Sequence, residues 1–224
     1  MEVPLVEIFS SVQGEGKYVG CRQVFVRFAD CNLRCRYCDT DFNGRVRWRI
    51  DDLIVEIERL MSEVPTHSIS LTGGEPLIHW GVILELARRL PSTKIFLETN
   101  GTLVDELERV IDVIDVVSMD VKLPHSIGRD VFEEHRRFMS IARRKDLYVK
   151  VVLDGETTVE EFDRAVEVIG SVSRDILLIL QPVTPVKDIR AVGSSDVLKF
   201  QARALRRLSD VRVIPQTHRL IGVP

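Results

Sequence analysis

Apolar residues along most of the chain recur in short β-rich runs that alternate with amphipathic stretches. The runs expected to form strands are 22–29, 68–73, 94–100, 115–122, 147–153, 176–183 and 211–216. The stretches expected to form helices are 51–63, 79–90, 105–111, 130–144, 158–171 and 195–208. In the first of these, Asp51 and Asp52 precede apolar residues at helical spacing, as is typical of a helix N-terminus. The alternation predicts a parallel sheet with helices packed outside it.

The number of strand–helix repeats indicates how far this sheet can close. We count about six β/α units, fewer than the eight of a complete TIM barrel. The runs 149–153 and 176–180 are rich in Val, Ile and Leu, as in strands that are covered on both faces or line a filled barrel. We therefore predict an α/β fold in the form of a partial, incomplete TIM-like barrel, built as a single domain over residues 1–224.

Composition and charge exclude several classes of protein. The chain is 45% hydrophobic and 29% charged, which is ordinary for a soluble globular protein. No apolar run reaches the ~18 residues of a membrane span, and the N-terminus does not resemble a signal peptide, so we expect a cytoplasmic protein without a membrane partner. The net charge is −3 and no dense Lys/Arg block occurs, which argues against a nucleic-acid partner.

Polar and glycine-rich segments follow the predicted strands. These segments are 30–41, 72–76, 98–101, 118–122 and 181–185. In barrels and open α/β sheets the chemistry occurs at the carboxyl ends of the strands. The segments are therefore expected to form one shared site.

The cysteines indicate the kind of site. All four, Cys21, Cys31, Cys35 and Cys38, lie within residues 21–38, and in a reducing cytosol such a group favours metal binding or catalysis over disulfides. Cys31, Cys35 and Cys38 form a C-x3-C-x2-C array on one predicted loop. Soft thiolates suit iron–sulfur clusters and zinc. Three ligands would leave one iron of a 4Fe–4S cluster open to a further ligand.

A zinc site completed by Cys21 or a histidine is the alternative, because structural zinc takes four ligands. Cys21 precedes a predicted strand of eight residues, which spans about 26 Å, and Cys31 follows that strand. Cys21 is therefore expected at the opposite end and is interpreted as a structural or incidental thiol. A zinc-binding or electron-transfer module remains a remote alternative.

The cysteine array followed by Thr72-Gly73-Gly74-Glu75-Pro76 resembles the radical S-adenosylmethionine (SAM) superfamily. That resemblance implies that the open iron binds SAM, which is cleaved to a 5′-deoxyadenosyl radical. It places Tyr37 where the superfamily packs the adenine, and the glycine-rich segment where backbone atoms hold the SAM amino group. Taken alone, the glycine-rich segment is equally compatible with a simple turn.

Further segments resemble one family, 7-carboxy-7-deazaguanine synthase. They are Ser10–Gly16, Cys38–Thr40, Glu98–Gly101, Asp120–Lys122, Gln181–Thr184 and Pro215–Pro224. The resemblance implies conversion of 6-carboxy-5,6,7,8-tetrahydropterin to 7-carboxy-7-deazaguanine with loss of ammonia, in the 7-deazapurine pathway to queuosine or archaeosine. It also implies a homodimer and an electron donor, which the sequence does not identify. A glycyl-radical activating enzyme is the nearest alternative.

The resemblance also assigns roles to individual residues. The SAM contacts it implies are Tyr37, Cys38, Asp39, Gly74, Asp120, Val121, Lys122, Gln181, Pro182, Val183 and Thr184. The substrate contacts it implies are Val12, Gln13, Gly14, Arg27, Thr72 and Pro224, supplied in part by an N-terminal extension (1–21) and a C-terminal tail (211–224). Thr40 corresponds to a magnesium ligand.

Some residues keep a second interpretation. Arg27 is equally compatible with a salt bridge at a strand end, and Thr40 with a turn or cap residue. The roles of Cys21, Glu15, His218, Glu98 and Asn100 stay open.

Overall fold

The computed structural model describes residues 1–38, 45–185 and 189–224. The strands are β1 (Glu2–Val12), β2 (Arg22–Phe28), β3 (Val46–Arg49), β4 (Ser68–Gly73), β5 (Ile95–Thr99), β6 (Val116–Asp120), β7 (Asp146–Leu153), β8 (Leu177–Pro182) and β9 (Val211–Val213). The α-helices are α1 (Ile50–Glu63), α2 (Trp80–Arg89), α3 (Val104–Val110), α4 (Pro124–Ile127), α5 (Phe132–Ala142), α6 (Val159–Val172), α7 (Ser194–Ala204) and α8 (Thr217–Ile221). Short 3-10 turns are η1 (Gly16–Tyr18), η3 (Pro76–His79) and η4 (Ile111–Val113).

Within the described part of the chain, the strands form one nine-stranded sheet in the order β3-β1-β2-β4-β5-β6-β7-β8-β9. Neighbours from β2 to β9 are parallel, whereas β1 is antiparallel to both β2 and β3. Helix α1 follows β3, the strands β4 to β8 are each followed by a helix, and these helices pack outside the sheet. The edge strands β3 and β9 stand at opposite ends of this order, so the predicted partial barrel is confirmed.

The N-terminal region is the main difference from the prediction. We treated residues 1–21 as an extension, but β1 lies inside the sheet and pairs with β2 from Leu5↔Phe28 to Val12↔Arg22. Pro4 and the acidic residues Glu2 and Glu7 interrupt the apolar pattern that would have indicated this strand. The short β3, α4 and α8 were also not predicted, and β9 ends at Val213 rather than at 216.

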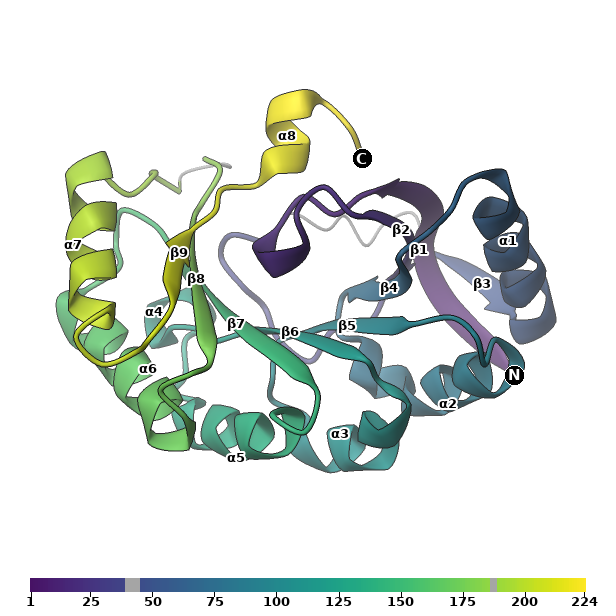
Figure 1. Cartoon of the computed structure of the whole chain (residues 1–224), viewed down its shortest axis with the longest axis horizontal. Coiled ribbons are helices and arrows are strands. Elements are labelled where there is room, and N and C mark those ends of the chain that lie inside the picture. The colour runs from purple at the N-terminus through teal and green to yellow at the C-terminus, as the bar shows by residue number, and fades with distance from the viewer. Residues whose placement is uncertain (39–44, 186–188) are drawn as a thin grey trace.

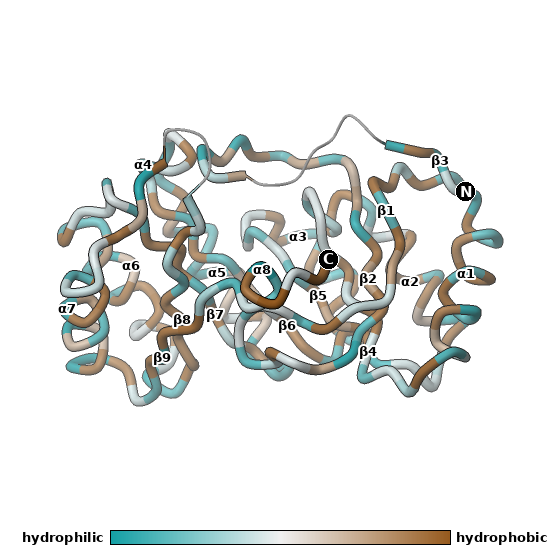
Figure 2. The backbone as a smooth tube through the Cα atoms, turned by 90° about the horizontal axis from the view of Figure 1, so that it is seen from above, coloured by the Kyte–Doolittle hydropathy of each residue, from teal (hydrophilic) through white to brown (hydrophobic). Residues whose placement is uncertain are grey.

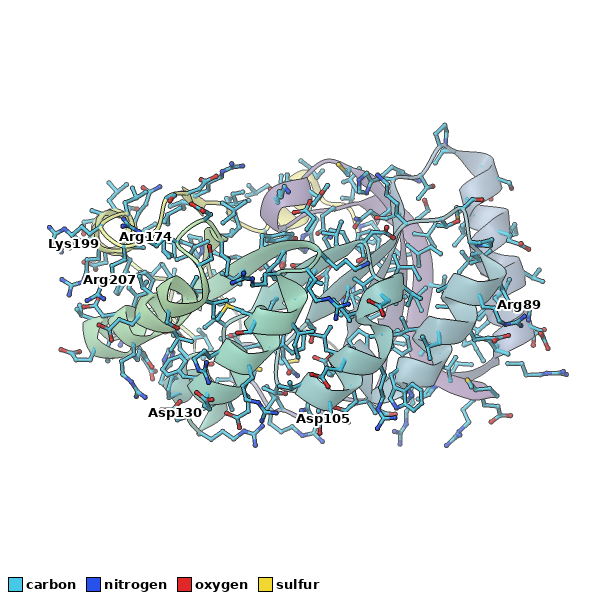
Figure 3. All side chains as sticks on the ribbon, turned by 60° about the horizontal axis from the view of Figure 1, so that its bottom comes forward. Arg89, Asp105, Asp130, Arg174, Lys199 and Arg207 are labelled. Atoms are coloured by element: carbon cyan, nitrogen blue, oxygen red, sulfur yellow. The ribbon has the colours of Figure 1, made fainter. Side chains whose placement is uncertain are left out.

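The curved sheet has helices on its convex side, and the main hydrophobic core fills the space between them (Figure 1). Charged side chains on that outer layer, such as Arg89 and Lys199, point away from the protein (Figure 3). The segment before β2 and helix α8 lie instead on the concave side (Figure 1). Among the described helices, none is both long and apolar enough to cross a membrane.

Alternation along each strand separates these two sides, because successive side chains of a strand point to opposite faces. In β7, Val149 and Val151 pack into the main core under the helices. Tyr148 and Lys150 point into the barrel, where Tyr148 belongs to a second apolar cluster and Lys150 lines a cavity. The concave side is thus layered, with aromatic side chains near the amino ends of the strands and polar ones above them.

Candidate functional site

A cavity of about 750 Å³ occupies the barrel interior at the carboxyl ends of the strands. The predicted residues that line it are Val12, Gln13, Gly14, Arg27, Cys31, Cys35, Tyr37, Cys38, Thr72, Gly74, Asp120, Lys122, Gln181, Val183, Thr184 and Pro224. The structure therefore brings together segments that lie more than 200 positions apart, from Val12 to Pro224. Val121 is instead buried in the main core, and Pro182 does not line the cavity. Asp39 and Thr40 lie outside the described residues.

The loop with the three cysteines follows β2 and is anchored at both ends. Asn32 accepts a hydrogen bond from Asn100 Nδ2 at 2.8 Å and donates one to Thr102 at 2.9 Å. Arg36 donates its backbone N–H to the carbonyl of Ser126 at 3.0 Å, and its guanidinium pairs with Glu156. Asn100, whose role the sequence left open, thus holds the cysteine loop against the end of β5.

The donor set of this loop suits an iron–sulfur cluster. Cys31, Cys35 and Cys38 are free thiols that line the same cavity. Burial raises the pKa of both Cys31 and Cys35, so these thiols are protonated until a metal binds. Across the described residues, no three His, Cys, Asp or Glu side chains converge as ligands of one metal ion. A cubane cluster does not require such convergence, because each thiolate binds a different iron.

Cys21 is separated from this loop by the whole of β2. It precedes Arg22, where the strand begins, whereas Cys31 follows the strand's last residue, Phe28. At the amino end of the barrel, the carbonyl of Cys21 accepts a hydrogen bond from the backbone N–H of Gln13. The backbone N–H of Cys21 donates to the carbonyl of Tyr18. This position agrees with the interpretation of Cys21 as a structural thiol.

The glycine-rich segment packs directly against the start of the cysteine loop. Gly74 and Glu75 donate their backbone N–H groups to the carbonyls of Phe28 and Asp30, at 2.8 and 2.7 Å. A Cβ at Gly74 would lie 2.0 Å from the Asp30 oxygen, so only glycine fits. The Glu75 carboxylate accepts hydrogen bonds from Thr99 Oγ1 and Asn100 N, and burial raises its pKa to about 7. The segment is thus fixed against the cysteine loop, and its role in holding SAM stays a prediction.

One side of the cavity offers an apolar surface beside buried polar atoms. Tyr37 packs against the cluster of Val152, Val183 and Ile189, and burial raises its pKa to about 12. Gln181 Oε1, a buried acceptor that lines the cavity, makes no hydrogen bond within the described structure, and the buried Ser118 and the carboxylate of Asp120 line the same wall. Buried polar atoms are normally satisfied, so Gln181 Oε1 indicates a polar ligand on this side.

The other side of the cavity is organised around Glu98. Its carboxylate accepts hydrogen bonds from Gln13 Nε2 at 2.9 Å and from Thr72 Oγ1 at 3.2 Å. Arg27 lies on β2 beside Thr72 of β4, with its Nε 2.8 Å from Glu7 Oε1 and its guanidinium 5.6 Å from the centre of the Phe9 ring. Both interpretations of Arg27 therefore remain, because the ion pair exists and the side chain also lines the cavity. The sequence did not identify Glu98 as the link between Gln13 and Thr72.

The C-terminal tail lies across the centre of the sheet as seen from above (Figure 2). Thr217 donates its backbone N–H to the carbonyl of Gly14 at 2.8 Å, and Ser11 Oγ donates to the carbonyl of Pro224 at 3.0 Å. The ring of His218 fills the space where a Gly14 side chain would be, since a Cβ there would approach Nδ1 to 2.1 Å. His218 thus packs against the N-terminal segment.

Four charged residues lie deeper in the cavity, and we call them the charged layer: the buried Lys122 and Lys150, and the half-buried Glu15 and Asp120. Lys150 Nζ lies 2.6 Å from Glu15 Oε2 and 3.3 Å from Asp120 Oδ1. Lys122 Nζ lies 2.7 Å from the other Asp120 oxygen. Burial alone would raise the pKa of both carboxyls, but the lysines outweigh it and lower the pKa of Asp120 to about 2 and that of Glu15 below its usual range.

Sequence reasoning missed Lys150 altogether. The run 147–153 was interpreted as apolar, although a lysine stands at its centre. A charge inside an otherwise buried strand requires a partner, because unpaired buried charges are strongly destabilising. That requirement was the signal available in the sequence.

Comparison with known proteins places this chain among radical SAM enzymes by sequence. The model of the radical SAM superfamily matches residues 26–170. The 7-carboxy-7-deazaguanine synthase of Geobacter sulfurreducens is 41% identical, over 97% of this chain and 96% of the relative. The protein of the same name from Methanothermobacter thermautotrophicus is 35% identical, over 100% of this chain and 98% of the relative.

A comparison of structures agrees on the fold. The crystal structure of QueE from Escherichia coli superimposes with a TM-score of 0.65 and 19% sequence identity, over 97% of this chain and 95% of that one. A radical SAM methyltransferase from Sphaerobacter thermophilus has a TM-score of 0.66 over 87% of this chain, with 13% identity. At such identities the likeness establishes the α/β architecture alone.

Proposed function

Because the chain belongs to the 7-carboxy-7-deazaguanine synthase family of the radical SAM superfamily, we propose that it converts 6-carboxy-5,6,7,8-tetrahydropterin to 7-carboxy-7-deazaguanine and releases ammonia. The observation that carries the proposal is one cavity lined by the cysteine loop, the glycine-rich segment and the side chains of Gln13, Arg27 and Thr72. The glycyl-radical activating enzyme and the zinc module have no comparable support.

Membership of the superfamily implies a 4Fe–4S cluster and SAM. Cys31, Cys35 and Cys38 would each hold one iron. When bound there, the cluster and SAM would supply the radical chemistry needed to remove a hydrogen atom from the substrate carbon bearing the carboxylate. The protein's own part is to bind, orient and shield the reactants.

On the SAM side, Tyr37 and the apolar cluster of Val152 and Val183 would cover the adenine. Gln181 Oε1, which makes no hydrogen bond in the described structure, is an acceptor for hydroxyl or amino donors, and the Asp120 carboxylate beside Lys150 is a second acceptor. Further proposed SAM contacts are Cys38, Asp39, Gly74, Val121, Lys122, Pro182, Val183 and Thr184. Val121 is buried in the main core and Pro182 does not line the cavity, so their contacts would be made by backbone atoms.

On the substrate side, Gln13 and Thr72 would bind the donor- and acceptor-rich pterin edge, with Val12 and Gly14 adding backbone groups. Arg27 would bind the substrate carboxylate, because a guanidinium has several donors and the ion pair with Glu7 engages only part of them. The tail that ends at Pro224 covers this side and would exclude water.

Four further components of the proposal rest on the family resemblance. Magnesium would bind at Thr40 together with waters and substrate oxygens, as Mg²⁺ prefers. The protein would act as a homodimer with a separate electron donor, and a reducing cytoplasm suits its thiolate ligands. Its product would enter 7-deazapurine synthesis for queuosine or archaeosine, nucleosides of modified tRNA.

The proposal is tested by anaerobic reconstitution with iron and sulfide, followed by reaction with SAM, a chemical reductant, magnesium and the carboxytetrahydropterin. We expect 7-carboxy-7-deazaguanine and ammonia, detected by mass spectrometry and an ammonia assay. A preparation with a fully loaded cluster that forms no deazaguanine would overturn the proposal. Removing magnesium with a chelator tests the metal separately. The rate or yield of ring contraction should then fall, whereas the remaining steps should be unaffected.

A further inference from the structure

The two sides of the cavity are supplied by different parts of the chain. The substrate side depends on the segment of Gln13, Gly14 and Glu15, which lies on the concave side of the sheet, together with the tail. The SAM side depends on the ends of β6 and β8 with the cysteine loop. A radical formed on one side reacts productively only if the substrate atom is held at a fixed distance from it, so the two sides need a rigid connection.

Glu15 is where the N-terminal segment and the tail are joined. Its backbone N–H donates to Gln13 Oε1 at 3.0 Å, and its carboxylate oxygen Oε1 accepts from Gln216 Nε2 at 2.8 Å. Gly16 follows with a φ of +66°, and a Cβ there would lie 2.4 Å from the Tyr148 ring. The segment therefore runs along β7, where Tyr148 and Lys150 are successive inward-facing residues.

Lys150 connects this junction to the SAM side. Its Nζ is 2.6 Å from Glu15 Oε2 and 3.3 Å from Asp120 Oδ1, and the residue is only 4% exposed. Asp120 is its direct neighbour in the β6–β7 pairing and stands where β6 ends. We propose that Lys150 is a positioning residue, which fixes the N-terminal segment and tail relative to Asp120 and so sets the distance between substrate and SAM. The connection that Lys150 makes between the N-terminal segment and Asp120 follows from this geometry. Its effect on the distance between substrate and SAM rests on the proposed function.

The charges of the surrounding groups support this role. Lys150 faces the carboxylates of Glu15 and Asp120, and Glu98 and Tyr148 also act on it electrostatically. These carboxylates keep the pKa of Lys150 well above its usual range despite burial, so it is a permanent cation. Without it, Glu15 would lose the cation that holds it in the cavity, since Lys122 is bound to the far oxygen of Asp120. A buried carboxylate without its partner moves toward water or takes up a proton.

The test uses Lys150→Met, which keeps the length of the side chain and removes the charge, and Lys150→Arg, which keeps the charge. Lys199→Met is the matched control, because Lys199 pairs with Asp196 on the exposed surface of α7. Hydrogen–deuterium exchange is measured by mass spectrometry on each protein before cluster reconstitution. For Lys150→Met we expect roughly tenfold faster exchange in both 13–18 and 214–224, as for loss of a charged hydrogen bond. Exchange in Lys150→Arg and in the control should stay near that of the wild type.

A second measurement follows the products of the reconstituted enzymes. In Lys150→Met, 5′-deoxyadenosine should accumulate in several-fold excess over deazaguanine, because SAM is still cleaved while the substrate is held at the wrong distance. Lys150→Arg should restore most of the coupling between the two products. If Lys150→Met does not fold, Glu15→Gln breaks the same ion pair from the other side and should loosen the same two segments.

The possible outcomes separate the two proposals. Unchanged exchange of 13–18 and 214–224 in Lys150→Met or Glu15→Gln would overturn the positioning role, even with a fully active wild type. Exchange that rises across the whole protein, rather than in these segments, would also overturn it. Faster exchange confined to both segments, in a protein whose wild type forms no deazaguanine, would support the positional role and reject the proposed function.

Discussion

Two layers inside the barrel are built on the same strand and differ in almost every physical respect. Tyr148 belongs to an aromatic layer with Tyr18 and Phe96, where Tyr18 meets Phe96 edge-on at 5.6 Å between ring centres. Lys150, the next inward residue, belongs to the charged layer. Burying aromatic surface stabilises a fold directly, whereas a buried ion pair gains little over apolar packing. The difference indicates that the aromatic layer maintains the fold and the charged layer maintains the geometry of the site.

The cysteines at the two ends of β2 lie next to these two different layers. Substituting them should give the largest expected difference in activity. Cys35→Ala, above the charged layer, should abolish cluster binding and all product formation, because two thiolates cannot hold the cubane in place. Cys21→Ala, beside the aromatic layer, should retain both. Iron content and visible absorbance after anaerobic reconstitution measure the difference. Equal iron loading in the two variants would contradict the ligand assignment.

The second test compares stability with activity in the two layers. Phe96→Ala should lower the free energy of unfolding by about 3–5 kcal/mol, since the ring is fully buried, with little change in activity per folded molecule. Ser118→Ala in the cavity wall should do the reverse, with a small effect on stability and weaker SAM binding, because its hydroxyl lines the cavity on the SAM side. Urea unfolding and SAM titration measure the two quantities. A stability loss in Ser118→Ala that equals that of Phe96→Ala would argue against the division.

The next test asks whether Arg27, on β2, binds the carboxylate of the substrate. Arg27→Met should raise KM for the carboxytetrahydropterin by roughly tenfold or more, as for loss of a hydrogen bond between charged groups. Cleavage of SAM in the absence of substrate should stay unchanged. Arg22→Met is the control, since Arg22 begins the same strand and its exposed guanidinium donates to Ser10 Oγ at 3.0 Å. If KM stays constant, Arg27 serves only its ion pair with Glu7.

The smallest expected effect is a decrease in the free energy of unfolding at acidic pH. The pKa of Asp120 is lowered to about 2, below its ordinary value of 3.8, because Lys122 and Lys150 outweigh burial. A lowered carboxyl pKa stabilises the fold fully above the ordinary value, and this contribution is lost as the pH falls through about 2. Urea unfolding at about pH 6 and about pH 3 should show a loss on the order of 1 kcal/mol greater in wild type than in Lys150→Met. Equal losses would show that the charged layer is not ionised as described.

Local sequence signals were sufficient for most of the barrel and for finding the loops that line the cavity. The strand runs and the glycine-rich segment depend on neighbouring residues, so their patterns are visible in one sequence. The charged layer is different, because Glu15 pairs with Lys150, 135 positions away, and with Gln216, 201 positions away. A single sequence does not show which charges meet. β1 was missed for a local reason, since Pro4 and Glu7 interrupt its apolar alternation.

The aromatic layer has a consequence for how the protein is made. Tyr18 Oη donates to Asp146 Oδ2 at 2.5 Å, across 128 positions of sequence. During synthesis the N-terminal segment leaves the ribosome long before the strand that receives it has been translated. Contacts between such distant positions form slowly, because a long loop of chain has to close first. We therefore expect the insertion of Tyr18 to be a late folding event, which exposes aromatic surface to chaperones and to aggregation until β7 is in place.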